Sequence, residues 1–190
     1  MQKHIQNSFG IKLNCIHDEY SKPIKIFNSG NPDEVNREFI ETLESYAIEC
    51  YKLTQQNKDM KNIKFIGHEK LNHYKCKSCF ECKKTFDLLD NKRVAHHDHI
   101  TGCFISSICS GCNLQLVYKK FIPVYLHNLK GYDAHLFIKC LNKYGQQSEE
   151  IKCIPNNEEK YISFNKKIKV DEYFNKKTKQ MEAIYYEIRF

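Results

Sequence analysis

The sequence lacks any segment that would anchor the chain in a membrane. No apolar run approaches the ~20 residues that a transmembrane helix needs. Residues 1–7 contain no apolar stretch of the kind found in signal peptides. The chain also has no internal repeat. These absences predict an intracellular protein of the cytoplasm or nucleus, without a membrane partner, in a compartment that keeps thiols reduced.

The composition fits a folded chain with an anionic partner. The 190 residues are 41% hydrophobic and include 12 Phe and 12 Tyr, which is enough for one medium domain and a small insert. A net charge of +7 favours binding to a polyanion. Ten cysteines in a reducing compartment indicate metal binding more often than disulfides.

Two C-x-x-C pairs predict a structural Zn²⁺ site. Such a pair folds into a knuckle that directs two thiolates to one tetrahedral ion. We prefer the pair beginning at Cys79 over the alternative pair beginning at Cys76, because Phe86 then lies where a knuckle commonly places an apolar residue. Cys76 is left as a spare thiol or substitute ligand. No thioredoxin-like βαβ pattern supports a redox function. The predicted ligands are Cys79, Cys82, Cys109 and Cys112.

A histidine-rich segment, VAHHDHITG at 94–102, lies between the pairs. The block from Cys79 to Asn113 resembles the HNH family, most closely its endonuclease VII branch, in which two knuckles hold a ββα-metal module. The resemblance implies that His96 and Asn113 bind a divalent ion, Mg²⁺ or Mn²⁺, and that His97 is the general base. An imidazole with a pKa near ~6.5 can take a proton from water at neutral pH, and the ion would stabilise charge on the phosphate.

The block departs from its relatives at His96, Ala95, Ile105 and Ser106. His96 replaces an aspartate, and other HNH proteins also have a histidine at this position. Ala95 replaces an arginine, and Ile105-Ser106 replaces an Arg-Gly pair. Losing both arginines predicts weaker contact with phosphate. The alternative is that the histidines are surface residues of a binding module without nuclease activity.

Hydrophobic periodicity predicts an α+β chain. Asn31 can cap a helix of about five turns, with Pro32 in its first turn and acidic residues beside it. Strands are expected at 8–16 and 23–27, joined as a hairpin or meander. The remaining expectations are a strand at 121–126, a linker at 63–74, a helix at 134–141, and two or three strands within 161–164, 168–170 and 183–188.

A second motif follows the cysteine block. The run at 122–138, IPVYLHNLKGYDAHLFI, resembles the second exonuclease motif of family B DNA polymerases, N-x-x-x-(Phe/Tyr)-Asp. The resemblance implies that Asp133 ligates a catalytic metal, that Asn128 positions a single-stranded 3′ end, and that Tyr132 packs beneath it. We expect Asp133 at a helix start with its carboxylate open to solvent, as two-metal chemistry requires. A strand–loop–helix junction with a capping Asp is the alternative.

The order of the two motifs resembles the protein-primed type B polymerases of Polinton/Maverick transposable elements and related viral or organellar enzymes. The resemblance covers nearly the whole chain. It implies a partial ribonuclease H-like exonuclease domain at 1–70 and 121–190, with a zinc ββα-metal insert at 71–120. By this resemblance the first motif, Asp-x-Glu, would lie before Met1, and the third motif and the palm would lie after Phe190.

The expected function is therefore that of a DNA-binding fragment of a proofreading DNA polymerase, unable to polymerise alone. Its expected partners are DNA, as a single-stranded 3′ end or a duplex, and the remainder of the polymerase or a terminal protein. Two alternatives remain open: a free-standing HNH nicking nuclease, and a non-catalytic, zinc-stabilised nucleic-acid-binding module.

Overall fold

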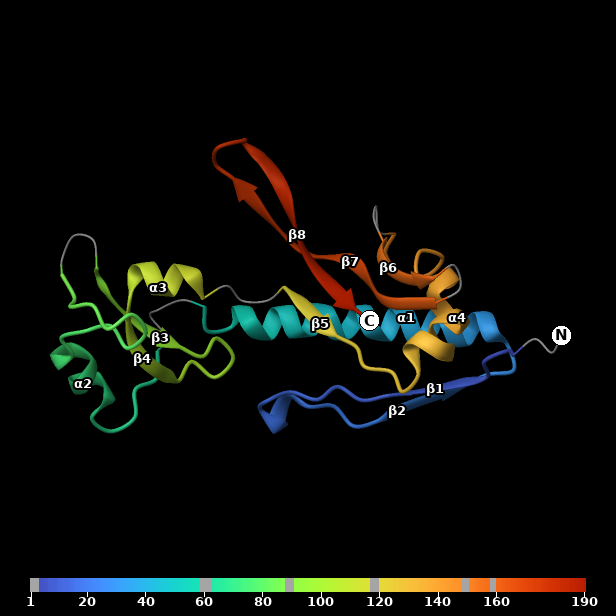
Figure 1. Cartoon of the computed structure of the whole chain (residues 1–190), viewed down its shortest axis with the longest axis horizontal. Coiled ribbons are helices and arrows are strands. Elements are labelled where there is room, and N and C mark those ends of the chain that lie inside the picture. The colour runs from blue at the N-terminus through green and yellow to red at the C-terminus, as the bar shows by residue number, and fades with distance from the viewer. Residues whose placement is uncertain (1–3, 59–62, 88–90, 117–119, 148–150, 158–159) are drawn as a thin grey trace. The chain divides into compact units, whose positions relative to one another are not determined.

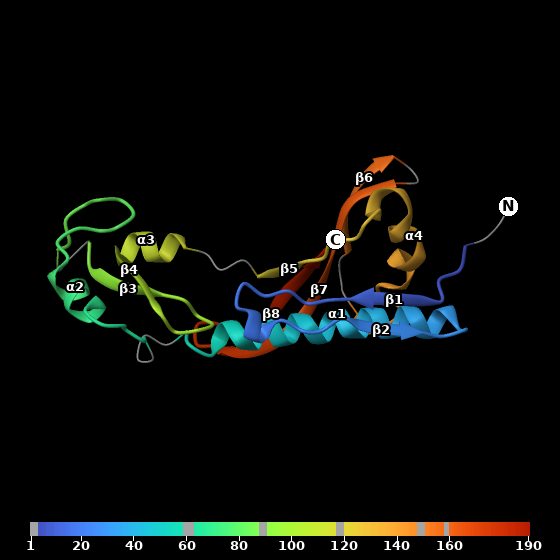
Figure 2. The same cartoon turned by 90° about the horizontal axis from the view of Figure 1, so that it is seen from below.

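The computed structural model describes residues 4–58, 63–87, 91–116, 120–147, 151–157 and 160–190. Within them the chain is a mixed α+β structure of three small sheets and few helices (Figures 1 and 2). It divides into two compact units, which are described separately. Unit 1 combines Met1–Glu49 with Lys120–Phe190, and unit 2 is Cys50–Lys119. The predicted boundaries of the insert, 71–120, stay a prediction.

Unit 1 begins with an antiparallel pair of strands, β1 (Ser8–Ile11) and β2 (Lys25–Asn28), with a 3₁₀ helix (Asp18–Tyr20) between them. The hairpin is confirmed, although β1 ends at Ile11 and is shorter than predicted. Beyond it, the two segments stay connected by hydrogen bonds from Lys22 N to Leu13 O and from Cys15 N to Ser21 Oγ, both at 2.9 Å.

Helix α1 (Pro32–Gln55) begins where its sequence predicts. The side chain of Asn31 accepts a hydrogen bond from the Asp33 amide at 3.0 Å, which satisfies one of the helix's unpaired amides. At 24 residues it is longer than the five turns expected. One face is buried, as amphipathic spacing requires. Its buried apolar residues are Val35, Ile40, Leu43, Ala47 and Tyr51.

The larger sheet of unit 1 has the order β5-β8-β7-β6. Strand β5 (Phe121–Pro123) runs parallel to β8 (Gln180–Arg189), and the other pairs are antiparallel. Strands β6 (Ile151–Asn157) and β7 (Lys160–Asn175) complete the sheet. The predicted strands 161–164 and 168–170 are both part of β7. A chain of phenylalanine rings, with neighbouring centroids 4.7–5.8 Å apart, forms much of the core: Phe9, Phe39, Phe137, Phe164 and Phe190.

A buried ion pair explains why the single strand β7 was predicted as two short strands with a break around Lys166. Lys166 is only 1% exposed, and its ammonium lies 2.6 Å from the carboxylate of Glu44 on α1, which is 8% exposed. The same ammonium donates to the carbonyls of Leu141 and Tyr144. Because every charge in this network has a partner, a lysine can occupy a core position in the middle of a strand.

Unit 2 contains α2 (Glu69–Lys75), β3 (Arg93–His97), β4 (Phe104–Cys109) and α3 (Ser110–Gln115). Strands β3 and β4 form an antiparallel hairpin. The prediction of a linker over 63–74 is wrong, because α2 occupies part of it and packs the ring of His73 against Phe65 and Phe104, which also contact each other. None of the helices in the described residues is both long and apolar enough to cross a membrane.

Gly145→Ala is expected to destabilise unit 1. Gly145 has a φ of +67°, and an added Cβ would contact Glu44 Oε1 and lie 2.6 Å from its Cδ. The substitution therefore combines backbone strain with displacement of a buried, paired carboxylate. We expect the free energy of unfolding to fall by about 2–4 kcal/mol, measured by urea denaturation.

Gly30→Ala is the matched control, since no atom lies within 4 Å of its added Cβ and its φ is not positive. We expect a change below about 0.5 kcal/mol there. Equal stability of the two variants would contradict this account of the ion pair.

Candidate metal centre and the loop at Asp133

The four predicted cysteines converge. Cys79 and Cys82 lie in the loop after α2, Cys109 ends β4, and Cys112 lies in α3. Their sulfur atoms are all within 4.8 Å of one another, and Cys82 Sγ is 3.9 Å from Cys109 Sγ. A tetrahedral zinc ion with Zn–S bonds of ~2.3 Å separates its sulfurs by about 3.8 Å. The four cysteines can therefore hold a metal ion, and four thiolates are the donor set of structural zinc.

Backbone hydrogen bonds hold the first knuckle in place. The Phe80 amide donates to Ser107 O on β4 at 2.9 Å, and the Cys79 amide donates to Lys84 O at 2.8 Å. Lys83, with a φ of 62°, makes the turn that allows Cys82 to face Cys79. Cysteine spacing and the edge of β4 thus fix the sulfur positions together.

The surroundings of Cys79 favour its thiolate. Burial by itself would raise the pKa of Cys79, but the amides of Cys82, Cys109 and Glu81 lower it to about 6. The hydrogen bond to the Cys109 sulfur, followed by burial, raises the pKa of Cys112 to about 12. Four thiolates so close together repel one another unless a cation lies among them, as metal ligation requires.

The register chosen for the first knuckle is confirmed. Cys76 lies outside the cluster, and its thiol donates to Ser78 O at 3.1 Å. Phe86 packs against the buried group of Cys79, Ile108 and Cys109, as the preferred register predicts. This apolar group is small, and two of its three buried members are cysteines.

The histidines occupy the end of β3, as expected, but they form no second cluster. His97 is buried, with Nε2 2.8 Å from Asn57 O and Nδ1 3.3 Å from Ala95 O. A general base must present an unprotonated ring nitrogen to water, and both nitrogens here face carbonyl oxygens. In the part of the chain that the structure describes, no group of three His, Cys, Asp or Glu ligands converges apart from the cysteines.

The other polar residues near His97 are also partly buried. His96 and His99 are half-buried, and burial lowers the pKa of each imidazole, with a further contribution from the charge of His97. Asp98 closes the turn after β3 by accepting from the amides of Ile100 and Thr101. Asn113 lies half-buried in α3. A divalent site at His96 and Asn113 stays a prediction.

The polymerase-like motif forms a closed loop between β5 and α4 (Ala134–Phe137), with a π-helical turn at Leu129–Asp133. Asp133 directly precedes α4, as expected. Asp133 is half-buried, and its Oδ2 accepts from the Asn128 amide at 2.8 Å in a hydrogen bond that is itself exposed. The solvent-open carboxylate stays a prediction. The Asn128 side chain accepts from Gly131 N at 3.2 Å. Tyr132 is 41% exposed and lies edge-on to His4, at 5.6 Å.

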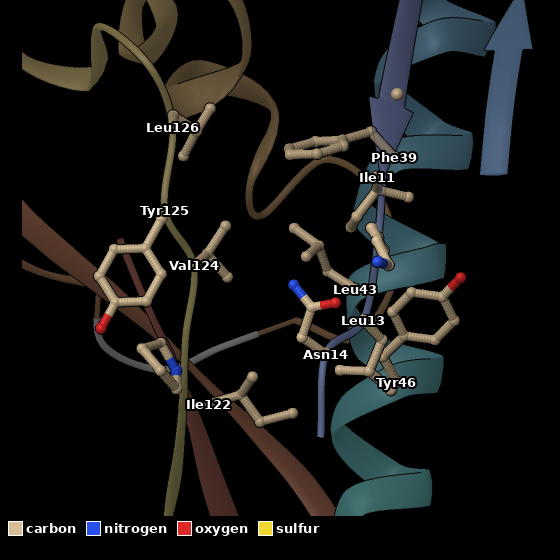
Figure 3. Close-up of a pocket in the computed structure, with 13 residues that line it drawn as sticks. Ile11, Leu13, Asn14, Phe39, Leu43, Tyr46, Ile122, Val124, Tyr125 and Leu126 are labelled. Atoms are coloured by element: carbon tan, nitrogen blue, oxygen red, sulfur yellow. The ribbon is translucent and has the colours of Figure 1, made fainter. Parts of the chain in front are cut away.

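A groove of about 380 Å³ lies in unit 1 (Figure 3). One wall is formed by residues 10–14 and α1, and the other by residues 122–126. Leu13 and Leu43 point toward Val124 across the gap. Lys12 is the one charged residue among those lining it. Such a lining can bury apolar groups but offers no acid–base pair for catalysis.

One buried polar pair in unit 2 is not predicted from the sequence. His73 Nδ1 lies 2.8 Å from Ser107 Oγ, and both residues are buried. Burial and the nearby Arg93 lower the pKa of His73. The pair joins α2 to β4, and nothing in the sequence indicates it once residues 63–74 are interpreted as a linker.

Comparison with protein-family models, with curated proteins and with solved structures gives no match in any of the three. The functional interpretation therefore depends on the residues themselves and on their geometry.

Cys82→Ser is expected to remove the metal. Cys82 is exposed, so its replacement costs no apolar burial, and any loss of stability reports ligation. We expect zinc measured in natively purified protein to fall from about one per chain to nearly none, because metal binding contributes the folding free energy of so small a core.

Cys153→Ser is the control, since Cys153 is also exposed and lies outside the cluster. It should retain one zinc per chain. Wild-type protein without zinc, or unchanged zinc in Cys82→Ser, would refute the site.

Proposed function

We propose that this chain is a DNA-binding segment of a family B DNA polymerase, in which a zinc-stabilised ββα-metal module interrupts a ribonuclease H-like exonuclease domain. The observation that carries the proposal is the junction of β5 and α4. There Asn128 and Asp133, the residues that the polymerase motif specifies, hold each other in one loop through the bond from Asn128 N to Asp133 Oδ2. A motif that resembles the polymerases in sequence thus also has a defined local geometry.

The groove in unit 1 adds support. Both β1 and β5 lie at the edge of their sheets, and both border the groove (Figure 3). Edge strands have backbone groups available for a further strand. We propose that the strand bearing Asp-x-Glu in the polymerase completes the domain between them, where its carboxylates could approach the end of β5. Asp133 alone cannot hold two metal ions.

The binding function is favoured over the nicking nuclease. The cysteine cluster gives unit 2 a framework, and the hairpin of β3 and β4 followed by α3 has the order of a ββα-metal module. His97, however, contacts carbonyl oxygens through both ring nitrogens. In our proposal this imidazole joins the segment at Asn57 to β3 and does not activate water.

DNA binding should be electrostatic and insensitive to sequence. The net charge of +7 suits phosphates, and binding releases counterions. We expect fluorescence anisotropy with labelled DNA to show at least a tenfold loss of affinity between about 50 and about 200 mM NaCl. Salt-independent binding, or a strong preference for one duplex sequence, would contradict the proposal.

The isolated chain is also expected to have no nuclease activity. Incubation with supercoiled plasmid, or with 3′-labelled single strands, and Mg²⁺ or Mn²⁺ should give neither nicks nor 3′–5′ degradation. Nicking that is lost in His97→Ala would instead support the free-standing nuclease. Degradation from the 3′ end that persists in Asp133→Ala would show that the polymerase motif is wrongly assigned.

A further inference from the structure

Almost all of the net positive charge of the chain lies in unit 2. Residues 50–119 contain 12 Lys and Arg against six Asp and Glu, while the remaining residues contain 18 against 17. Four thiolates and one Zn²⁺ together carry a charge of −2, so unit 2 keeps an excess of positive charge with the metal bound. A polyanion is therefore expected to bind unit 2 in preference to unit 1.

Unit 2 has an open hollow of about 340 Å³ beside the first knuckle. Asn72 and His73 of α2 line one side, and Ser106 and Ser107 of β4 line another. The His73–Ser107 hydrogen bond lies among these lining residues. Phe104 and Ile105 also line the hollow, so most of its surface is apolar. Its volume is close to that of known small-ligand sites, which begin near ~300 Å³.

An aromatic ring and a cation stand at this hollow. Phe80 lines it and is 61% exposed. The ammonium of Lys83, another lining residue, lies 4.6 Å from the centroid of the Phe80 ring and donates to the Phe80 carbonyl. An ammonium has three donors, so it can contact a phosphate oxygen as well.

The fold does not need an aromatic ring at position 80. The apolar contact of the knuckle with its core is made by Phe86, which packs against Cys79 and Ile108. A single exposed phenylalanine is ordinary on a protein surface. One placed beside a lysine, at a hollow with a mostly apolar lining, on the basic unit of the chain matches the pattern of aromatic platforms and cations that bind single-stranded nucleic acid.

We propose that this hollow binds a base of single-stranded nucleic acid, with the base stacked on Phe80 and the adjoining phosphate at Lys83. The inference rests on the proposed DNA binding and gives it a location and a preference for single strands. Stacking tolerates any base, so no sequence preference follows. In a duplex the bases stay stacked on one another and their faces are not accessible to Phe80.

The test uses the full chain with zinc bound and a labelled oligothymidylate. Phe80→Ala should weaken binding of the single strand about tenfold, because base–aromatic stacking contributes on this scale. It should leave duplex binding and the salt dependence unchanged. Lys83→Ala should weaken the binding of single-stranded and of duplex DNA alike. It should also reduce the slope of log affinity against log salt by about one.

Phe174→Ala is the matched control, since Phe174 is an exposed aromatic of β7 in unit 1, at 57% exposure, and lies outside the groove and the polymerase-like motif. It should bind as the wild type does. One zinc per chain in Phe80→Ala verifies that the knuckle is intact. Wild-type single-strand affinity in Phe80→Ala would overturn this site and leave DNA binding standing, whereas a wild-type chain that binds no nucleic acid would overturn the proposed function as well.

Discussion

The convergence of four cysteine sulfurs is the constraint on which unit 2 depends. Its apolar cluster consists of Cys79, Ile108 and Cys109, with Phe86 and Cys112 packed against them. So small a group buries little surface, and small domains of this kind fold through metal binding. The knuckle, the end of β4 and the start of α3 all meet at the sulfurs. Without a cation among them, the thiolates that hold these elements together would repel one another.

Unit 1 is stabilised by different interactions. A continuous series of phenylalanine ring contacts connects β1, α1, α4, β7 and the C-terminal residue. The Glu44–Lys166 pair joins α1 to β7. Neither interaction requires a ligand. We therefore expect metal removal to act on one unit, and the difference in charge between the units suggests that they also differ in what they bind.

The sequence was sufficient where local chemistry decides the outcome. Cysteine spacing identified the metal ligands, and the side chain of Asn31 caps α1 as its position predicts. It failed where distant residues decide. Lys166 interrupts the apolar pattern of β7, yet it is buried because it pairs with Glu44. Glu44 lies 122 positions away in the sequence, so the pattern of β7 alone does not reveal the pair. Helix α2 is stabilised by Ser107 and Phe104 on β4, which its own sequence does not reveal.

The candidate catalytic residues illustrate the same limit. The motifs placed His97 at the end of a strand and Asp133 before a helix, and both positions are correct. What a motif does not contain is the partner of each polar atom. The carbonyl of Asn57 faces one nitrogen of His97, and the amide of Asn128 donates to Asp133. Each contact joins a candidate catalytic group to a neighbouring backbone segment, which the motif alone does not reveal.

Hydrogen exchange of the full chain, with zinc bound and after chelation, tests the central claim most directly. Amides of β3 and β4 should lose their protection when the metal is removed, while amides of β7 and β8 keep theirs, because the two pairs of strands lie in separate compact units. Unchanged protection of β3 and β4 without metal would contradict the account, as would simultaneous loss of protection in both units.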